Sequence, residues 1–64
     1  MVYRVVLETE RDNRKGQLVH KVGTNDYGVK RLVKDANDYF NLGIDWVGTE
    51  DIARKKLNQF TRGN

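Results

Sequence analysis

The single histidine of this 64-residue chain, His20, is its only imidazole for acid–base chemistry. A histidine base needs a nucleophile and an orienting group within hydrogen-bond reach. The chain contains no Cys and no Ser, and its threonines are explained by a strand end, helix caps and the end of the chain (Thr9, Thr24, Thr49 and Thr61). We therefore expect His20 to be a structural residue of a strand, and we predict that the protein is not an enzyme.

The carboxylates and glycines also have simpler explanations than a reactive site. Asp35 and Asp38 lie three residues apart, near basic neighbours, and the adjacent Glu50 and Asp51 suit the first turn of a helix. Gly43 and Gly48 lack the Lys-Ser/Thr pair that follows the glycines of a phosphate-binding loop. The sequence predicts no metal site and no cofactor.

Basic residues are the strongest candidates for a binding function. The chain has 12 Lys and Arg against 9 Asp and Glu, a net charge of +3 that is spread over its whole length. Loops and helix faces that carry such residues commonly contact phosphates. The predicted nucleic-acid-binding residues are Arg11, Arg14 and Lys15 on a loop, Lys30, Arg31 and Lys34 on a first helix, and Arg54, Lys55 and Lys56 on a second. The alternative is an ordinary solvated surface.

Aromatic residues suggest a second binding function. Trp46 lies in a short segment between two glycines. Tyr27 precedes the expected first helix, and Tyr39 lies near the end of that helix. Trp and Tyr are the commonest anchors of protein interfaces, although in so small a domain they also fill the core. The alternative to nucleic-acid binding is therefore a modulator or inhibitor of a larger protein, of the compact kind that phages and mobile elements encode.

Alternating apolar residues predict two strands in the N-terminal part. Val2–Glu10 is rich in β-branched residues, and Gln17–Val22 repeats the alternation. The segment between them, residues 11–16, contains Asp, Asn and Gly, which favour a hairpin loop.

A helical period predicts two helices in the remainder. After Gly23, apolar residues recur at a spacing of three and four (Val29, Leu32, Val33, Ala36, Tyr39 and Phe40). A second helix begins at the cap Thr49, with a buried stripe of Ile52, Ala53, Leu57 and Phe60. Residues 44–47 form a third strand or a buried connection. The predicted fold is a single α+β domain over residues 1–64, in the order β-β-α-(β)-α, with residues 61–64 frayed.

Spacing argues against two common DNA-binding architectures. A helix-turn-helix joins its helices through about 3–4 residues, whereas residues 41–48 separate the expected helices. A ribbon-helix-helix repressor has no counterpart to the first strand or to Asp45-Trp46-Val47.

No apolar run approaches the ~18 residues that span a bilayer. We expect a cytoplasmic protein that binds DNA, RNA or a larger protein and no membrane, and a homodimer stays open as an alternative.

Overall fold

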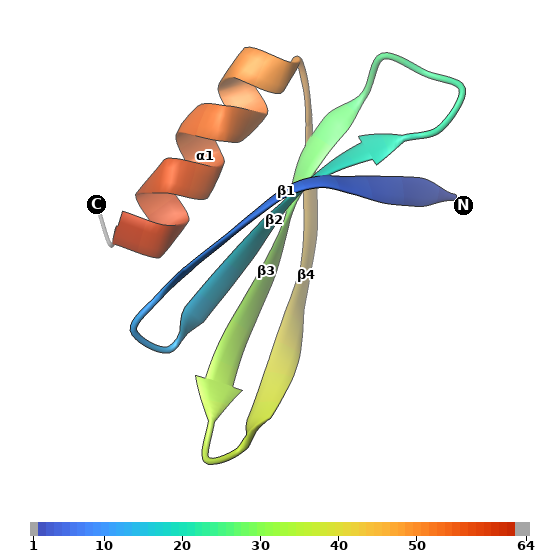
Figure 1. Ribbon diagram of the computed structural model, residues 1–64. Helices are drawn as coiled ribbons and strands as arrows, with labels where there is room; N and C mark the ends of the chain where they lie inside the picture. The colour runs from blue at the N-terminus through green and yellow to red at the C-terminus, as the bar shows by residue number, and fades with distance from the viewer. Residues whose placement is uncertain (1, 63–64) are drawn as a thin grey trace.

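A computed structural model describes residues 2–62 and shows a four-stranded antiparallel sheet with one helix on one side (Figure 1). The strands are β1 (Tyr3–Arg11), β2 (Arg14–Lys21), β3 (Tyr27–Asp35) and β4 (Asp38–Gly48), and each pairs with the next in the order β1-β2-β3-β4. The helix α1 (Glu50–Arg62) follows β4 directly. The sheet is therefore a meander of consecutive hairpins.

The prediction of two helices in the order β-β-α-(β)-α is wrong. The segment expected to be the first helix forms β3 and the first part of β4, and residues 44–47 belong to β4 rather than to a separate strand. The N-terminal hairpin is confirmed, although its loop is only the two residues Asp12 and Asn13.

Turn chemistry and strand propensity explain why a hairpin replaces the expected helix. The turn runs through Asp35-Ala36-Asn37-Asp38, where Asp and Asn favour turns and Ala36 adopts a positive φ of 59°. Before the turn, Val29 and Val33 fall on one face of an extended segment and Lys30 and Lys34 on the other. After it, Tyr39 and Phe40 begin a segment rich in β-formers. The helical spacing is real, but Ala36, taken as one of its apolar contacts, is exposed in the turn.

The C-terminal helix begins as predicted. The Thr49 hydroxyl accepts a hydrogen bond from the Ile52 amide at 3.3 Å, and the Thr49 carbonyl accepts one from the Ala53 amide. Two details of the prediction are wrong: Ile52 is exposed, so it does not belong to the buried stripe, and Thr61 is a buried part of the last turn rather than frayed. Arg62 also lies in α1, and residues 63 and 64 lie outside the described part.

The two faces of the sheet differ because only one is packed against α1. On the covered face, Leu18 and Val29 pack against Ala53 and Leu57 to form the core. A Cβ at Gly16 would collide with the Leu57 side chain, so the absence of a side chain there lets the helix lie close to β2. We call the opposite side of the sheet the open face, because α1 does not reach it (Figure 1).

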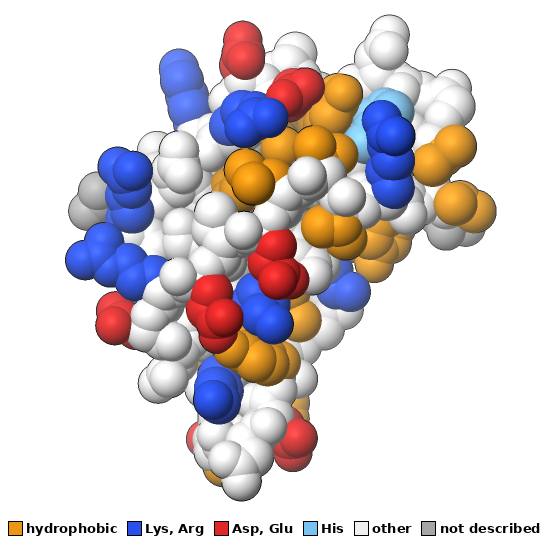
Figure 2. Space-filling view, viewed as in Figure 1, with side chains coloured by type: hydrophobic (Ala, Val, Ile, Leu, Met, Phe, Trp, Pro, Cys, Tyr) orange, Lys and Arg blue, Asp and Glu red, His pale blue; other side chains and the backbone are white. Residues whose placement is uncertain are grey.

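Both outer strands carry exposed apolar residues. Figure 2 shows hydrophobic side chains at several places on the surface of the molecule. In the N-terminal segment the exposed apolar residues are Val2, Val5, Val6 and Leu7. On β4 the exposed members are Phe40 and Leu42. Each outer strand also has an irregular register, at Val6 in β1 and at Leu42 and Val47 in β4, and such bulges discourage uncontrolled edge pairing. Among residues 2–62, no helix has the length and apolar character needed to cross a membrane.

Candidate functional site

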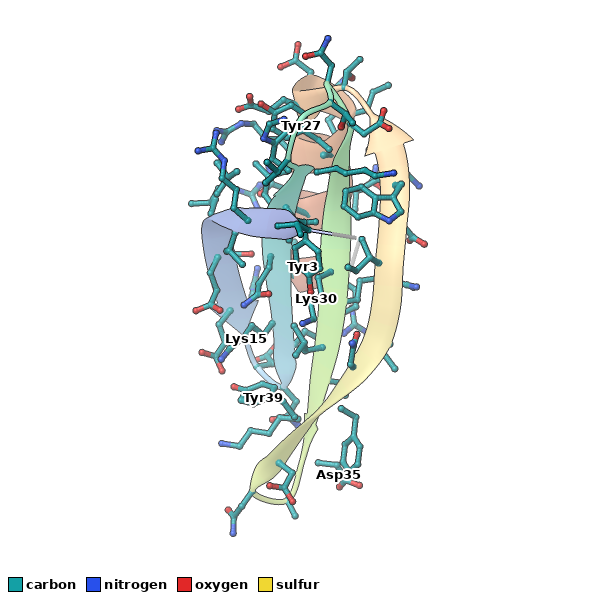
Figure 3. The ribbon with its side chains drawn as sticks, turned by 90° about the vertical axis from the view of Figure 1, so that its right-hand side faces the viewer. Tyr3, Lys15, Tyr27, Lys30, Asp35 and Tyr39 are labelled. Carbon is teal, nitrogen blue, oxygen red and sulfur yellow. The ribbon has the colours of Figure 1, made fainter. Side chains whose placement is uncertain are left out.

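The open face carries a mixture of aromatic and cationic side chains drawn from all four strands. Strand register places these residues on it: Tyr3, Glu8 and Glu10 of β1, Lys15, Gln17 and Lys21 of β2, Lys30, Leu32 and Lys34 of β3, and Tyr39, Asn41, Ile44 and Trp46 of β4. Figure 3 looks onto this face, where Tyr3, Lys30, Lys15 and Tyr39 follow one another along the length of the sheet. Aromatic rings thus stand at both ends of the row, with lysines between them.

At one end of the row, Tyr3 and Trp46 form an aromatic pair. Their ring centroids are 6.2 Å apart and the rings meet edge to face at 75°. Gly28 makes this possible, because a Cβ there would lie 2.9 Å from Trp46 Cε3. Lys30 Nζ donates a hydrogen bond to the Tyr3 hydroxyl at 3.2 Å. The half-buried indole therefore lies across Gly28, and the Lys30 ammonium lies beside the Tyr3–Trp46 pair.

At the other end, Tyr39 lies among charged groups. Lys15 Nζ is 4.2 Å from the centroid of its ring, and Lys34 Nζ is 6.0 Å from it. The Tyr39 hydroxyl donates a hydrogen bond to the Glu10 carboxylate, which tethers the ring across the sheet toward β1. One ring is thus flanked by two cations from neighbouring strands.

The charges of the open face are segregated between strands. The lysines lie on β2 and β3, whereas the carboxylates Glu8 and Glu10 lie on β1. Glu8 accepts a hydrogen bond from Gln17 at 2.7 Å, and Glu10 accepts one from Tyr39. Both acids are therefore held at the β1 side, which leaves the middle of the face cationic.

The structure divides the predicted basic residues between several surfaces. Lys15, Lys30 and Lys34 share the open face, but Arg14 and Arg31 lie on the covered face. Arg14 donates to the Phe60 carbonyl, and Arg31 forms an ion pair with Asp45. Arg11 pairs with Arg14 beside the first turn, and the exposed Arg54, Lys55 and Lys56 lie on α1. The expected common face of Lys30, Arg31 and Lys34 does not exist, because adjacent residues of a strand point to opposite sides.

The predicted aromatic anchors are also divided. Trp46 and Tyr39 lie on the open face, whereas Tyr27 packs against the core on the other side and stacks on His20 at 4.6 Å. Tyr3 was missed as a site residue, although its place in an alternating strand puts it on the same face as Val5. The alternation of residues along the strand, together with an aromatic residue at the strand end, could have identified Tyr3 as a site residue.

The histidine and the carboxylates of residues 2–62 give no metal or acid–base site. His20 Nε2 lies 2.7 Å from the Thr24 carbonyl oxygen, which accounts for one ring nitrogen, and the ring packs on Tyr27. Within residues 2–62, no three His, Asp or Glu residues come together in a way that would hold a metal ion. No known protein family, curated protein or solved structure matches this chain.

Proposed function

We propose that the protein binds single-stranded nucleic acid across the open face. The observation that carries this proposal is the row of Tyr3, Lys30, Lys15 and Tyr39, with Trp46 beside Tyr3, on the face of the sheet that α1 leaves uncovered (Figure 3). A positively charged surface with aromatic rings on which bases stack is how single strands are bound without a base-specific code.

Aromatic rings favour a single strand over a duplex. Unpaired bases expose their π faces and stack on Tyr and Trp, at about 1–3 kcal/mol per base, whereas the bases of a duplex are already stacked on one another. The open face belongs to a sheet, and the helix lies behind it, so no helix is placed for entry into a major groove. The rings of Trp46 and Tyr39, at the two ends of the row, supply two stacking positions.

Lysines between the rings suit the phosphates that join successive bases. Lys15, Lys30 and Lys34 provide point charges on two adjacent strands. Glu8 and Glu10 repel a polyanion at the β1 side, so the bound nucleic acid runs over β2, β3 and β4. This path differs from the loop-and-helix contact that the sequence suggests, because Arg54, Lys55 and Lys56 lie on α1, away from the open face.

Quenching of Trp46, the only tryptophan, by mixed-sequence single-stranded DNA and RNA tests the proposal. Binding should be measured from low to physiological salt, where each phosphate contact on a single strand contributes about −0.7 to the log–log slope. Lys34→Gln should reduce that slope by one such contact. Lys55→Gln is the matched control, since it removes the same charge from an exposed residue of α1.

A second pair of variants separates stacking from charge. Tyr39→Ala should weaken binding about 5- to 100-fold through the loss of one stacked base, while Tyr39→Phe, which keeps the ring, should retain most of the affinity. Absence of binding at low salt would refute the proposal. Equal effects of Lys34→Gln and Lys55→Gln would also count against it, because they would indicate a response to net charge alone.

Protein binding is the second candidate function, and the exposed apolar edge of β1 favours it. Val5, Val6 and Leu7 are exposed on a strand whose outer main-chain groups have no partner strand among residues 2–62. An extended segment of a larger protein that adds beside β1 would satisfy those groups and cover the apolar side chains. Val6→Lys should then abolish binding of the purified partner, whereas Leu42→Lys on the opposite edge should leave it unchanged.

A further inference from the structure

A cleft on the opposite side of the sheet from the open face separates α1 from strands β3 and β4. Its volume is about 310 Å³, close to the lower end of the range for small-molecule sites. It exists because α1 packs mainly over β2 and β3 and leaves part of β4 uncovered. The lining residues are Arg14, Val29, Arg31, Asp45, Lys56, Gln59 and Phe60.

Positive charge predominates in this cleft. Arg14, Arg31 and Lys56 line it with a single carboxylate, that of Asp45. Within residues 2–62, the Lys56 side chain makes no hydrogen bond or ion pair of its own. Three cations that converge on one concavity with only one acid suit a dianion, which would balance the excess.

Arg31 is held in place but is incompletely satisfied. Its Nη2 donates to the Leu42 carbonyl at 3.3 Å, and its Nε lies 3.4 Å from Asp45 Oδ2. That Nε is buried and has no hydrogen-bond acceptor in the described residues. A ligand therefore reaches this guanidinium through its terminal nitrogens, since 34% of the Arg31 side chain is exposed.

Shape completes the site. Phe60 and Val29 give an apolar wall, and Arg14 lies over the Phe60 ring at 5.6 Å. The cleft thus offers cations for an anion and an adjoining apolar surface for the group attached to it.

We propose that this cleft binds a phosphate monoester of a small organic molecule. The guanidinium of Arg31 presents donors in the planar arrangement that phosphate oxygens accept, and Lys56 adds a mobile point charge. The ester group packs on Phe60. This site is separate from the open face and does not depend on nucleic-acid binding there.

The test uses the full chain, with adenosine monophosphate and inorganic phosphate as probes, followed by NMR shifts of the backbone amides. Adenosine monophosphate should shift amides around Arg31, Asp45 and Phe60, and should bind more tightly than inorganic phosphate. Lys56→Gln should weaken it about two- to fivefold, as for an exposed ion pair, and Lys55→Gln, its sequence neighbour, should not. Asp45→Asn should strengthen binding, because it removes the competing carboxylate.

A free monoester and the end of a nucleic acid share this chemistry, and a third probe distinguishes them. If a 5′-phosphorylated oligonucleotide shifts the cleft amides and its 5′-hydroxyl counterpart does not, the cleft holds a strand terminus; if only the nucleotide does, it holds a free metabolite. Either result supports a monoester site. Absence of shifts in the cleft at millimolar adenosine monophosphate, or equal weakening by Lys55→Gln and Lys56→Gln, would overturn the proposal, and neither result bears on binding at the open face.

Discussion

The two faces of the sheet are built from the same strands and yet differ in what their side chains do. Leu18 and Val29 point to the covered face and are completely or almost completely buried. Their immediate neighbours in sequence, Gln17 and Lys30, point to the open face and stay accessible. At these positions a shift of one residue changes a side chain from one that stabilises the fold to one available for binding. Val19 is the exception, because it points to the open face and is fully buried there.

This separation matters because the core is small. The fully buried apolar side chains of residues 2–62 are Leu18, Val19, Val29, Ala53 and Leu57, and a domain of this size has only ~3–5 kcal/mol of net stability. Stability thus depends on few contacts: Leu18, Val29, Ala53 and Leu57 form the core on the covered face, and Val19 is buried on the open face, where it pairs with Val5 and Gly28. The open face retains Tyr3, Tyr39 and Trp46 in half-buried positions, where they are available to a partner.

The largest expected effect is the loss of a core side chain on the covered face. Leu57→Ala should lower the free energy of unfolding by about 2–5 kcal/mol, because Leu57 is buried against Leu18 and Val29. Leu32→Ala makes the same chemical change on the open face, where the side chain is only half-buried, and should cost about 1 kcal/mol. Urea unfolding monitored by circular dichroism measures both values. Equal losses of unfolding free energy would show that Leu32 on the open face stabilises the fold as much as Leu57 on the covered face.

A smaller effect is expected where the open face is packed most tightly. Gly28→Ala places a methyl group 2.7 Å from the Asp45 carbonyl and 2.9 Å from the Trp46 ring, so the indole must move away from the sheet. Overpacking of this kind costs about 1–3 kcal/mol. The Trp46 emission should shift to longer wavelength as the ring becomes more exposed. An unchanged spectrum would show that Trp46 does not rest on Gly28.

Part of this fold could be predicted from the sequence, and the reason the rest could not is specific. The β1–β2 hairpin and the Thr49 cap of α1 rest on local signals: a period of two, an Asp-Asn turn, and a hydroxyl before two acids. In the segment 24–42, the apolar residues fit a helical spacing, and strand alternation competes with it. The turn at residues 35–38 and the β-formers around it favour the strand, as does the pairing of β3 with β2, which no local spacing in the sequence encodes.

The candidate site was predictable only in part, for the same reason. Lys15, Lys30, Lys34, Tyr39 and Trp46 were all singled out as residue types suited to binding, but their common face follows from register. Once residues 27–35 are a strand, Lys30 and Lys34 point to one side and Arg31 to the other. The cleft between α1 and β4 depends on how far the helix covers the sheet, which no spacing in the sequence encodes.

A still smaller effect is expected at the start of the helix that covers one face. Thr49→Ala removes the hydroxyl that caps the Ile52 amide and should lower the free energy of unfolding by about 1 kcal/mol. Thr49→Ser, which keeps an acceptor, should be nearly neutral. Both values come from the same urea titration. A large loss in both variants would show that Thr49 acts through its methyl group, and the cap would then be unimportant.

The smallest effect concerns the outer surface of α1, which belongs to neither face of the sheet. Glu50 and Arg54 form an ion pair at 2.8 Å, one helical turn apart and partly exposed. The double-mutant cycle of Glu50→Gln and Arg54→Gln should give a coupling energy of about 0.3–0.5 kcal/mol at low salt, which declines as salt screens the pair. Asp51→Asn is the control for Glu50→Gln. Asp51 also lies in the first turn and shares the favourable interaction with the helix dipole, but no ion pair of residues 2–62 includes it. A coupling energy above 1 kcal/mol would mean that the exposed side of α1 stabilises the domain as the core does. Stability would then not depend mainly on the buried side chains.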